Sequence, residues 1–122
     1  MARFGRRSKR ELKTCEPELQ RLLNEAIKVL DFSVLEGHRG QEDQDKAYRD
    51  GFSKLMWPDG RHNKSPSRAV DLAPYPIDFQ DIKRFEILGW FVKGLAKGLG
   101  IKVIWGGDWA NFRDWGHFEL VD

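Results

Sequence analysis

The sequence predicts an α+β fold in which helices flank a small antiparallel sheet. Segments with helical and strand-like patterns are mixed along the chain, without the regular strand–helix–strand alternation of a parallel sheet. The chain has 122 residues, enough for one domain whose core needs no disulfide or metal to hold it together. It contains no internal repeat, low-complexity stretch or linker. We therefore predict that residues 1–122 form a single domain.

Residues 15–30 predict the first amphipathic helix. Apolar side chains recur there at helical offsets, with polar residues between them. Thr14 and Pro17 mark its beginning, because proline is well tolerated in the first turn of a helix. The apolar face consists of Leu19, Leu22, Leu23, Ala26, Ile27 and Leu30.

A short strand and a second helix are expected next. Residues 32–35 have the pattern of a strand, and the polar residues 41–52 favour a helix. Arg39 lies at the junction between them, where a side chain can be held rigidly. Its neighbour His38 should point to the opposite side, as adjacent residues of an extended backbone do. The buried stripe of the helix is predicted to be Ala47, Tyr48 and Phe52.

A strand and the longest helix are predicted in the middle of the chain. Small and β-branched residues at 68–73 indicate a short strand, which Pro74 ends. Residues 79–99 form the longest periodic segment, and Gly98 or Gly100 can terminate this helix. Its apolar face consists of Ile82, Phe85, Leu88, Phe91, Val92 and Leu95.

Two further strands, at residues 101–105 and 115–120, are expected around a turn at 106–107. Three of the five tryptophans cluster in this part of the chain, and large aromatic side chains most often supply buried area. We interpret them as core residues, and the alternative is that a ring lines a substrate cleft. They are Trp105, Trp109 and Trp115.

Two histidines and two aspartates predict a metal site. His62, Asp71 and His117 are two imidazoles and a carboxylate, a set that suits zinc and leaves a fourth coordination position for water. Asp114 lies three residues before His117, an offset that can place a proton-accepting carboxylate beside a metal. The chain has neither an H-E-x-x-H nor a C-x-x-C motif. Spacing alone therefore also allows the alternative that these histidines are scattered surface residues.

Four segments, in order, resemble the peptidase M15 family, which contains D-Ala-D-Ala carboxypeptidases and phage L-alanyl-D-glutamate endopeptidases. The segments are LEGHRGQEDQDKAYRDGFSK (35–54), RHNKSPSRAVDLAPYP (61–76), VIWGGDW (103–109) and FRDWGHFEL (112–120). Because they span most of the chain, the resemblance covers a whole domain. It implies the fold that hedgehog proteins share with DD-peptidases.

The resemblance also implies roles for individual residues. Asp114 corresponds to the catalytic acid and base of the phage endopeptidase branch. Arg39 matches the arginine that the family places at the substrate carbonyl or carboxylate. Gln44 matches a position near that arginine and is assigned to substrate binding, and we also assign Trp115, from the tryptophan cluster, to that role. The ligands of one zinc ion would be His62, Asp71 and His117.

The chain departs from the family pattern at three places. Many relatives read S-x-H-x-x-G-x-A-x-D, with seven positions from His to Asp, whereas His62 and Asp71 are nine apart and Gly60 replaces the serine. Gly116 precedes the last histidine, where relatives often have proline. We interpret these two departures as loop variation around an intact site. Asp114 stands where the carboxypeptidase branch has glutamate, which favours the endopeptidase interpretation.

The resemblance implies a zinc-dependent peptidoglycan peptidase that cleaves the L-alanyl-D-glutamate bond of the stem peptide, as a phage endolysin in host lysis. Such an enzyme would be made in the host cytoplasm, act in the periplasm as a monomer, and depend on a holin for its release. Two alternatives stay open. One is a D-alanyl-D-alanine carboxypeptidase, and the other is a zinc-containing binding module without turnover.

Net charge is +2, but residues 1–13 carry six basic side chains and one acidic residue, Glu11. We interpret this segment as a solvated, partly ordered arm with some mobility. Attraction to anionic cell-envelope polymers is the second interpretation. Nucleic-acid binding is not expected, because the arm lacks the interleaved aromatic residues on which bases stack.

The single cysteine, Cys15, has no partner for an internal disulfide, and we expect it to be a small, partly buried residue. No apolar run approaches the roughly 20 residues that span a bilayer, so no membrane insertion is expected. The basic residues near the N-terminus are not followed by the apolar segment of a secretory signal.

Overall fold

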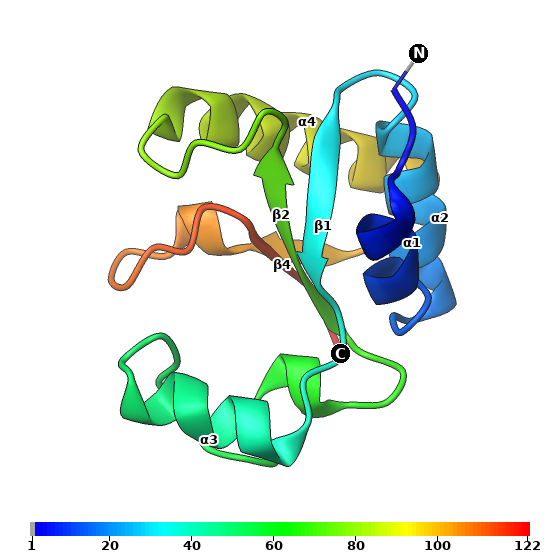
Figure 1. The fold of residues 1–122 in the computed structure, drawn as a ribbon. Helices are drawn as coiled ribbons and strands as arrows, with labels where there is room; N and C mark the ends of the chain where they lie inside the picture. The colour runs from blue at the N-terminus through cyan, green and yellow to red at the C-terminus, as the bar shows by residue number, and fades with distance from the viewer. Residues whose placement is uncertain (1) are drawn as a thin grey trace.

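The computed structural model describes residues 2–122, and its centre is a four-stranded antiparallel sheet (Figure 1). The order of the strands is β1-β2-β4-β3, and every neighbouring pair is antiparallel. The predicted α+β class with a small antiparallel sheet is therefore confirmed. The strands are β1 (Phe32–Glu36), β2 (Ala69–Pro74), β3 (Val103–Trp105) and β4 (His117–Leu120).

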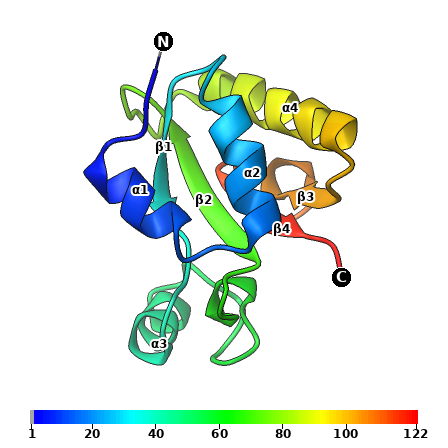
Figure 2. The same ribbon diagram turned by 90° about the vertical axis from the view of Figure 1, so that its right-hand side faces the viewer.

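Three helices pack against the sheet, and the fourth lies apart from it. Helix α1 (Arg6–Leu12) packs beside β1, while α2 (Pro17–Ala26) and α4 (Ile82–Leu99) contact each other and cover one face of the sheet (Figure 2). Helix α3 (Gln41–Arg49) lies beyond the ends of the strands, together with the short 3-10 helix η1 (Arg61–Asn63) (Figure 1). The chain therefore has a packed side and a more open side.

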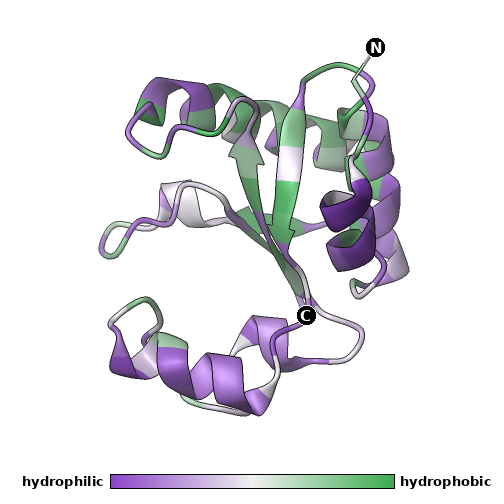
Figure 3. Cartoon of the chain, viewed as in Figure 1, coloured by the Kyte–Doolittle hydropathy of each residue, from purple (hydrophilic) through white to green (hydrophobic). Residues whose placement is uncertain are grey.

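The apolar core lies between the sheet and the helices α2 and α4. Figure 3 shows apolar residues along the strands and the inner sides of these helices, whereas α3 is mostly hydrophilic. Trp105, only 2% exposed, fills the space beneath α4. A Cβ atom on Gly89 would lie 2.2 Å from the Trp105 ring, and one on Gly107 would lie 2.3 Å from it. Both positions must therefore be glycine for the indole to pack so closely.

The helices differ from the predictions mainly at their ends. The helix predicted at 79–99 is α4, which ends at Gly100, a residue in the left-handed region with φ 75°. The helix predicted at 15–30 is shorter, since α2 ends at Ala26. Within residues 2–122, no helix has the length and apolar character needed to cross a membrane.

The predicted buried stripe of the second helix is wrong at Tyr48 and Phe52, while Ala47 is half-buried. Tyr48 is 44% exposed and Phe52 is 78% exposed, whereas the polar side chain of Gln44 is completely buried. The reason is the position of α3: it does not pack on the apolar face of the sheet, so its inward side meets polar neighbours instead of a hydrophobic core.

The prediction of a solvated arm at residues 1–13 is wrong for the side of this segment that packs beside β1. Ser8 and Leu12 are buried on one side of α1, and Phe4, just before the helix, is buried as well. The Ser8 hydroxyl accepts a hydrogen bond of 2.9 Å from the backbone N–H of Val34 in β1. The basic residues lie on the outer side of this docked helix. Met1, also part of the predicted arm, lies outside the described residues.

Candidate metal centre and active site

Pairing of two strands brings two of the predicted metal ligands together. Asp71 of β2 lies directly opposite His117 of β4, so both side chains share one face of the sheet. Nδ1 of His117 lies 3.1 Å from Oδ1 of Asp71. His62 of η1 completes the group, with its Nε2 3.3 Å from Oδ2 of Asp71. One ligand atom from each residue lies within 4.8 Å of the others, so this ligand group could hold a metal ion.

The hydrogen bonds of His62 fit a metal ligand. Its Nδ1 lies 2.7 Å from the backbone carbonyl oxygen of Gly37, so this nitrogen carries the proton and donates it. Its Nε2 is buried and has no hydrogen-bond partner within residues 2–122. In this tautomer, Nε2 presents a lone pair to the carboxylate of Asp71. The Nε2 lone pair and the carboxylate oxygen of Asp71 thus face each other, and a cation bound between them would stabilise this arrangement.

The environment of His117 favours positive charge. Burial lowers the pKa of this imidazole, but hydrogen bonds to Asp71 and Glu119 outweigh burial and raise the pKa to about 9. Conversely, although burial raises the pKa of Asp71, the neighbouring imidazole of His62 and the hydrogen bond from His117 hold it well below its usual range.

Glu119 belongs to the site although sequence analysis missed it. Nε2 of His117 donates to its carboxylate over 2.8 Å, and a carboxylate in this position orients a metal-binding imidazole. Nε of Arg61 lies 3.5 Å from the same carboxylate, which ties η1 to β4. The signal was present in the sequence, because residues two apart in a strand point to the same face.

Arg39 lies on one side of the ligand group and is held by polar side chains. Its Nε donates to Glu36 over 3.0 Å and its Nη1 donates to Gln44 over 3.0 Å. Its Nη2 lies 3.7 Å from Oδ2 of Asp71. Its backbone N–H also donates to the carbonyl of His62 over 2.7 Å. The guanidinium is therefore fixed beside the ligand group.

Gln44 lines the cavity, but protein groups occupy its amide. The oxygen accepts from Arg39 and from Asn63, and the nitrogen donates to Ser53 and Leu55. All of its hydrogen-bonding groups thus have partners within the protein. These contacts make Gln44 a positioning residue for Arg39, while its predicted contact with substrate stays a prediction.

Asp114 lies in the turn before β4 and lines the same cavity as the ligand group. Burial, and after it the negative charge of Asp71, raises the pKa of its carboxyl above the ordinary value. Its backbone carbonyl accepts a hydrogen bond of 3.2 Å from the N–H of His117, and its own N–H donates to Gly106 over 3.1 Å. A Cβ on Gly106 would lie 2.3 Å from the Asp114 carbonyl oxygen, so only glycine allows this approach. The turn thereby holds Asp114 close to the ligand group.

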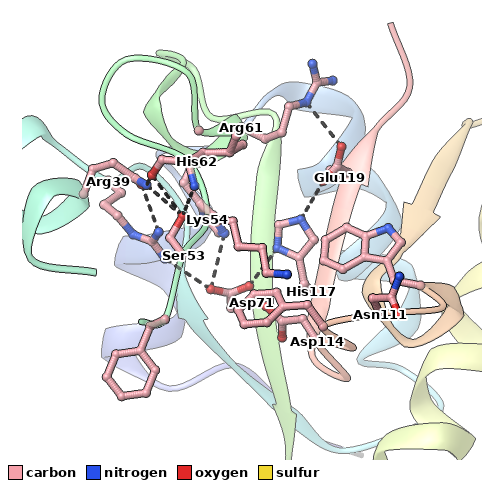
Figure 4. A pocket seen from close by; sticks show the side chains of 16 residues that line it. Arg39, Ser53, Lys54, Arg61, His62, Asp71, Asn111, Asp114, His117 and Glu119 are labelled. Carbon is pink, nitrogen blue, oxygen red and sulfur yellow. Dashed lines mark hydrogen bonds and ion pairs between the residues drawn. The ribbon is translucent and has the colours of Figure 1, made fainter. Parts of the chain in front are cut away.

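A cavity of about 290 Å³ contains these groups (Figure 4). Its rim carries the exposed apolar side chains of Phe52, Leu55 and Phe112. The indole of Trp109 also lines the cavity, and its ring centroid lies 5.2 Å from that of the His117 imidazole. The cavity therefore combines charged groups at its base with apolar walls, as ligand-binding sites commonly do.

The three clustered tryptophans have different places. Trp105 belongs to the core, as the sequence interpretation expected. Trp115, assigned to substrate binding, lies outside the cavity that contains the ligand group, because it packs against Trp105 with ring centroids 6.0 Å apart. Trp109 is the tryptophan that faces the cavity.

Comparison with known proteins identifies the family. Residues 1–121 match the family described as phage L-alanyl-D-glutamate peptidase. This match covers nearly the whole chain, and the protein therefore belongs to that family. The resemblance to M15 peptidases, found from the motifs, is confirmed.

Individual relatives agree with this assignment. The L-alanyl-D-glutamate peptidase of Escherichia phage T5 is 30% identical over 135 residues, covering 98% of each chain. The peptidoglycan L-alanyl-D-glutamate endopeptidase CwlK of Bacillus subtilis is 31% identical over 109 residues, covering 79% of this chain and 64% of CwlK. The crystal structure of the Serratia marcescens L-Ala D-Glu endopeptidase ChiX superposes with a TM-score of 0.84 at 28% identity, covering 98% of this chain and 91% of ChiX.

Proposed function

We propose that residues 1–122 form one zinc peptidase domain that hydrolyses the L-alanyl-D-glutamate bond of the peptidoglycan stem peptide. The observation that carries the proposal is the convergence of His62, Asp71 and His117 in one cavity with Asp114, in a chain of this peptidase family. The printed names of the relatives supply the bond, and the cavity supplies the chemical groups.

His62, Asp71 and His117 would hold the zinc ion. Two imidazoles and one carboxylate are a ligand set typical of catalytic zinc, and the unpaired Nε2 of His62 supports the assignment. When bound, zinc acts as a Lewis acid toward a carbonyl oxygen and makes water more acidic. Glu119 would orient the ring of His117 through the hydrogen bond at Nε2.

Asp114 is the general base and then the general acid. Its carboxylate takes a proton from the attacking water while the water oxygen bonds to the alanyl carbonyl carbon. When the carbon–nitrogen bond breaks, Asp114 returns the proton to the departing amine of D-glutamate. Burial supports this role, because a carboxyl with a raised pKa holds and releases a proton more readily near neutral pH.

Arg39 stabilises the negative charge that develops on the carbonyl oxygen. Donors fixed before the reaction are effective because they need no reorganisation as charge develops. Glu36 and Gln44 fix the guanidinium of Arg39 next to the ligand group. Gln44 thus contributes to catalysis by positioning.

For the biological role, we propose a phage endolysin that acts in host lysis. It would work as a monomer on peptidoglycan in the periplasm and would reach this substrate with the help of a holin. The membership of the phage peptidase family supports this setting.

Identification of the broken bond tests the proposal. Purified protein would be stripped of metal, reloaded with zinc and incubated with soluble muropeptides, and the products would be identified by mass spectrometry. We expect fragments that begin at D-glutamate, formed only with zinc. Loss of a single alanine would instead indicate a D-alanyl-D-alanine carboxypeptidase. Stoichiometric zinc binding with no product would indicate a binding module.

A further inference from the structure

Lys54 is a cation in the cavity that has no acidic partner. The cavity is also lined by Arg39, which pairs with Glu36, and by Arg61, which pairs with Asp122. Within residues 2–122, no acidic side chain forms an ion pair with Lys54. Of these three cationic side chains, Lys54 is thus the one with its charge available to a ligand.

The position of Lys54 is defined by an aromatic ring across the cavity. Its Nζ lies over the ring of Phe112, 4.9 Å from the centroid. Figure 4 shows its side chain among the groups that line the cavity. The contact joins the loop after α3 to the turn before β4.

The backbone at Phe112 is strained. Its φ of 49° is the only positive value at a non-glycine residue within residues 2–122. Such strain persists where the surrounding structure imposes it, and it is concentrated at functional sites. Phe112 precedes Asp114 by two residues. The neighbours of Lys54, Ser53 and Leu55, are bound by Gln44, while its Nζ reaches the ring of Phe112, so the side chain spans the cavity from Gln44 to the turn that carries Asp114.

The proposed reaction places a carboxylate near Asp114. In the stem peptide, D-glutamate continues the chain through its γ-carboxyl, so its α-carboxylate is free. That carboxylate is attached to the carbon that bears the scissile nitrogen. Because Asp114 protonates this nitrogen, the α-carboxylate must lie near Asp114 when the bond breaks.

We infer that Lys54 binds the α-carboxylate of the D-glutamyl residue and makes the enzyme selective for stem peptides in which this group is free. The inference rests on the proposed function. Stem peptides that carry D-isoglutamine, with an α-carboxamide in place of the carboxylate, lose the ion pair and are poorer substrates. Arg39 does not take this role, because Glu36 and Gln44 fix its guanidinium where it serves the carbonyl oxygen in the proposed reaction.

Two matched substrates and three variants test the inference. The substrates are L-Ala-γ-D-Glu-diaminopimelate and its D-isoglutaminyl counterpart, which differ only in the α-carboxylate. The variants are Lys54→Met, Lys54→Arg and, as a control, Lys83→Met, an exposed lysine of α4 outside the cavity. Zinc content and circular dichroism would be measured for each variant, together with kcat and KM on both substrates.

We expect the zinc-loaded protein to prefer the free acid by about 10-fold in kcat/KM, the scale of one charge-assisted hydrogen bond. Lys54→Met should abolish the preference, mainly by raising KM for the free acid, since the carboxylate is present in both ground and transition states. Lys54→Arg should keep most of it, and Lys83→Met all of it.

Two results would overturn the inference while leaving the proposed function intact. One is equal cleavage of both substrates by the unaltered protein, and the other is an undiminished preference in Lys54→Met. Failure of the zinc-loaded protein to cleave either substrate would overturn the proposed function and the inference with it.

Discussion

The strand half of the candidate site, Asp71 and His117, is fixed differently from the loop half, His62 and Arg39. The strand half is positioned by the ladder between β2 and β4, where the two residues are direct partners. The strand residues that point the other way belong to the apolar core. Their positions are thus determined by backbone pairing and hydrophobic burial together.

The loop half depends on a few polar side chains. Gln44 and Asn63 link α3, Arg39 and the loop around η1 through side-chain hydrogen bonds. Helix α3 contributes no large apolar side chain to the core cluster. The difference suggests that single polar substitutions can disturb the loop half while the sheet and its ligands stay in place.

The largest effect should follow removal of a ligand from either half. His117→Ala and His62→Ala should both lose zinc and reduce hydrolysis to background, because two protein ligands hold the ion poorly. Both variants should keep the circular dichroism of the parent, since the core does not depend on these side chains. Metal analysis after gel filtration would measure the loss.

His38→Ala is the matched control, since His38 does not line the cavity. It should keep both zinc and activity. Full zinc occupancy in His117→Ala would remove that residue from the ligand set.

Asp114→Asn should come next, with activity reduced about 10²–10⁴-fold, the usual cost of losing a general acid–base group. Zinc content should be unchanged, because Asp114 lies beside the ligand group and is not part of it. Single-turnover rates on a muropeptide would measure the effect, with Asp108→Asn as a control acid outside the cavity. Parental activity in Asp114→Asn would exclude it from proton transfer.

Gln44→Leu and Leu22→Ala should both lower stability, but only Gln44→Leu should lower kcat/KM, and this difference separates the two regions. Gln44→Leu leaves buried polar partners unsatisfied, so it should cost about 1–3 kcal/mol of stability and also lower kcat/KM through a less constrained Arg39. Leu22→Ala opens a cavity in the core, at a cost of about 2–5 kcal/mol. It should leave kcat/KM of the folded protein unchanged.

Denaturant unfolding and steady-state kinetics on both variants would check this comparison. If Leu22→Ala lowered kcat/KM as much as Gln44→Leu does, the two regions would not be energetically separate.

The same contrast explains which features the sequence predicted. Strands and the long helix α4 have strong periodic patterns, so their locations were predicted well. Helix α3 was located correctly, but its buried side was not, because Gln44 is buried by polar contacts that hydrophobic periodicity does not describe. The docking of α1 was missed because a high density of basic residues obscured the few buried positions, Phe4 before the helix and Ser8 and Leu12 within it.

Within the site, the ligand group was identified from residue types and from a family resemblance. The ladder between β2 and β4 explains how two ligands distant in sequence meet, and no sequence spacing contains that information. Glu119 was predictable from strand alternation. The sequence could not predict that Trp109, and not Trp115, lines the cavity. The position of Trp109 depends on the turn at residues 106–108, the 3-10 helix η2 (Gly106–Asp108).

The smallest effect concerns Cys15, which lies where the two halves join. It forms an isolated bridge with Ser67, and its Sγ would be 2.9 Å from a Cβ on Gly37. Burial raises the pKa of its thiol from 9.0 to about 11. At pH 8 only about one thiol in a thousand would be ionised in the folded protein, and the thiolate is the form that reacts.

Iodoacetamide should therefore label the native protein very slowly and the guanidinium-unfolded protein readily, as mass spectrometry would show. Rapid labelling of the native protein would mean that the junction opens locally, so that the loop half moves independently of the sheet. Cys15→Ala, which removes only a buried thiol, should keep the parental activity and serve as the unlabelled control.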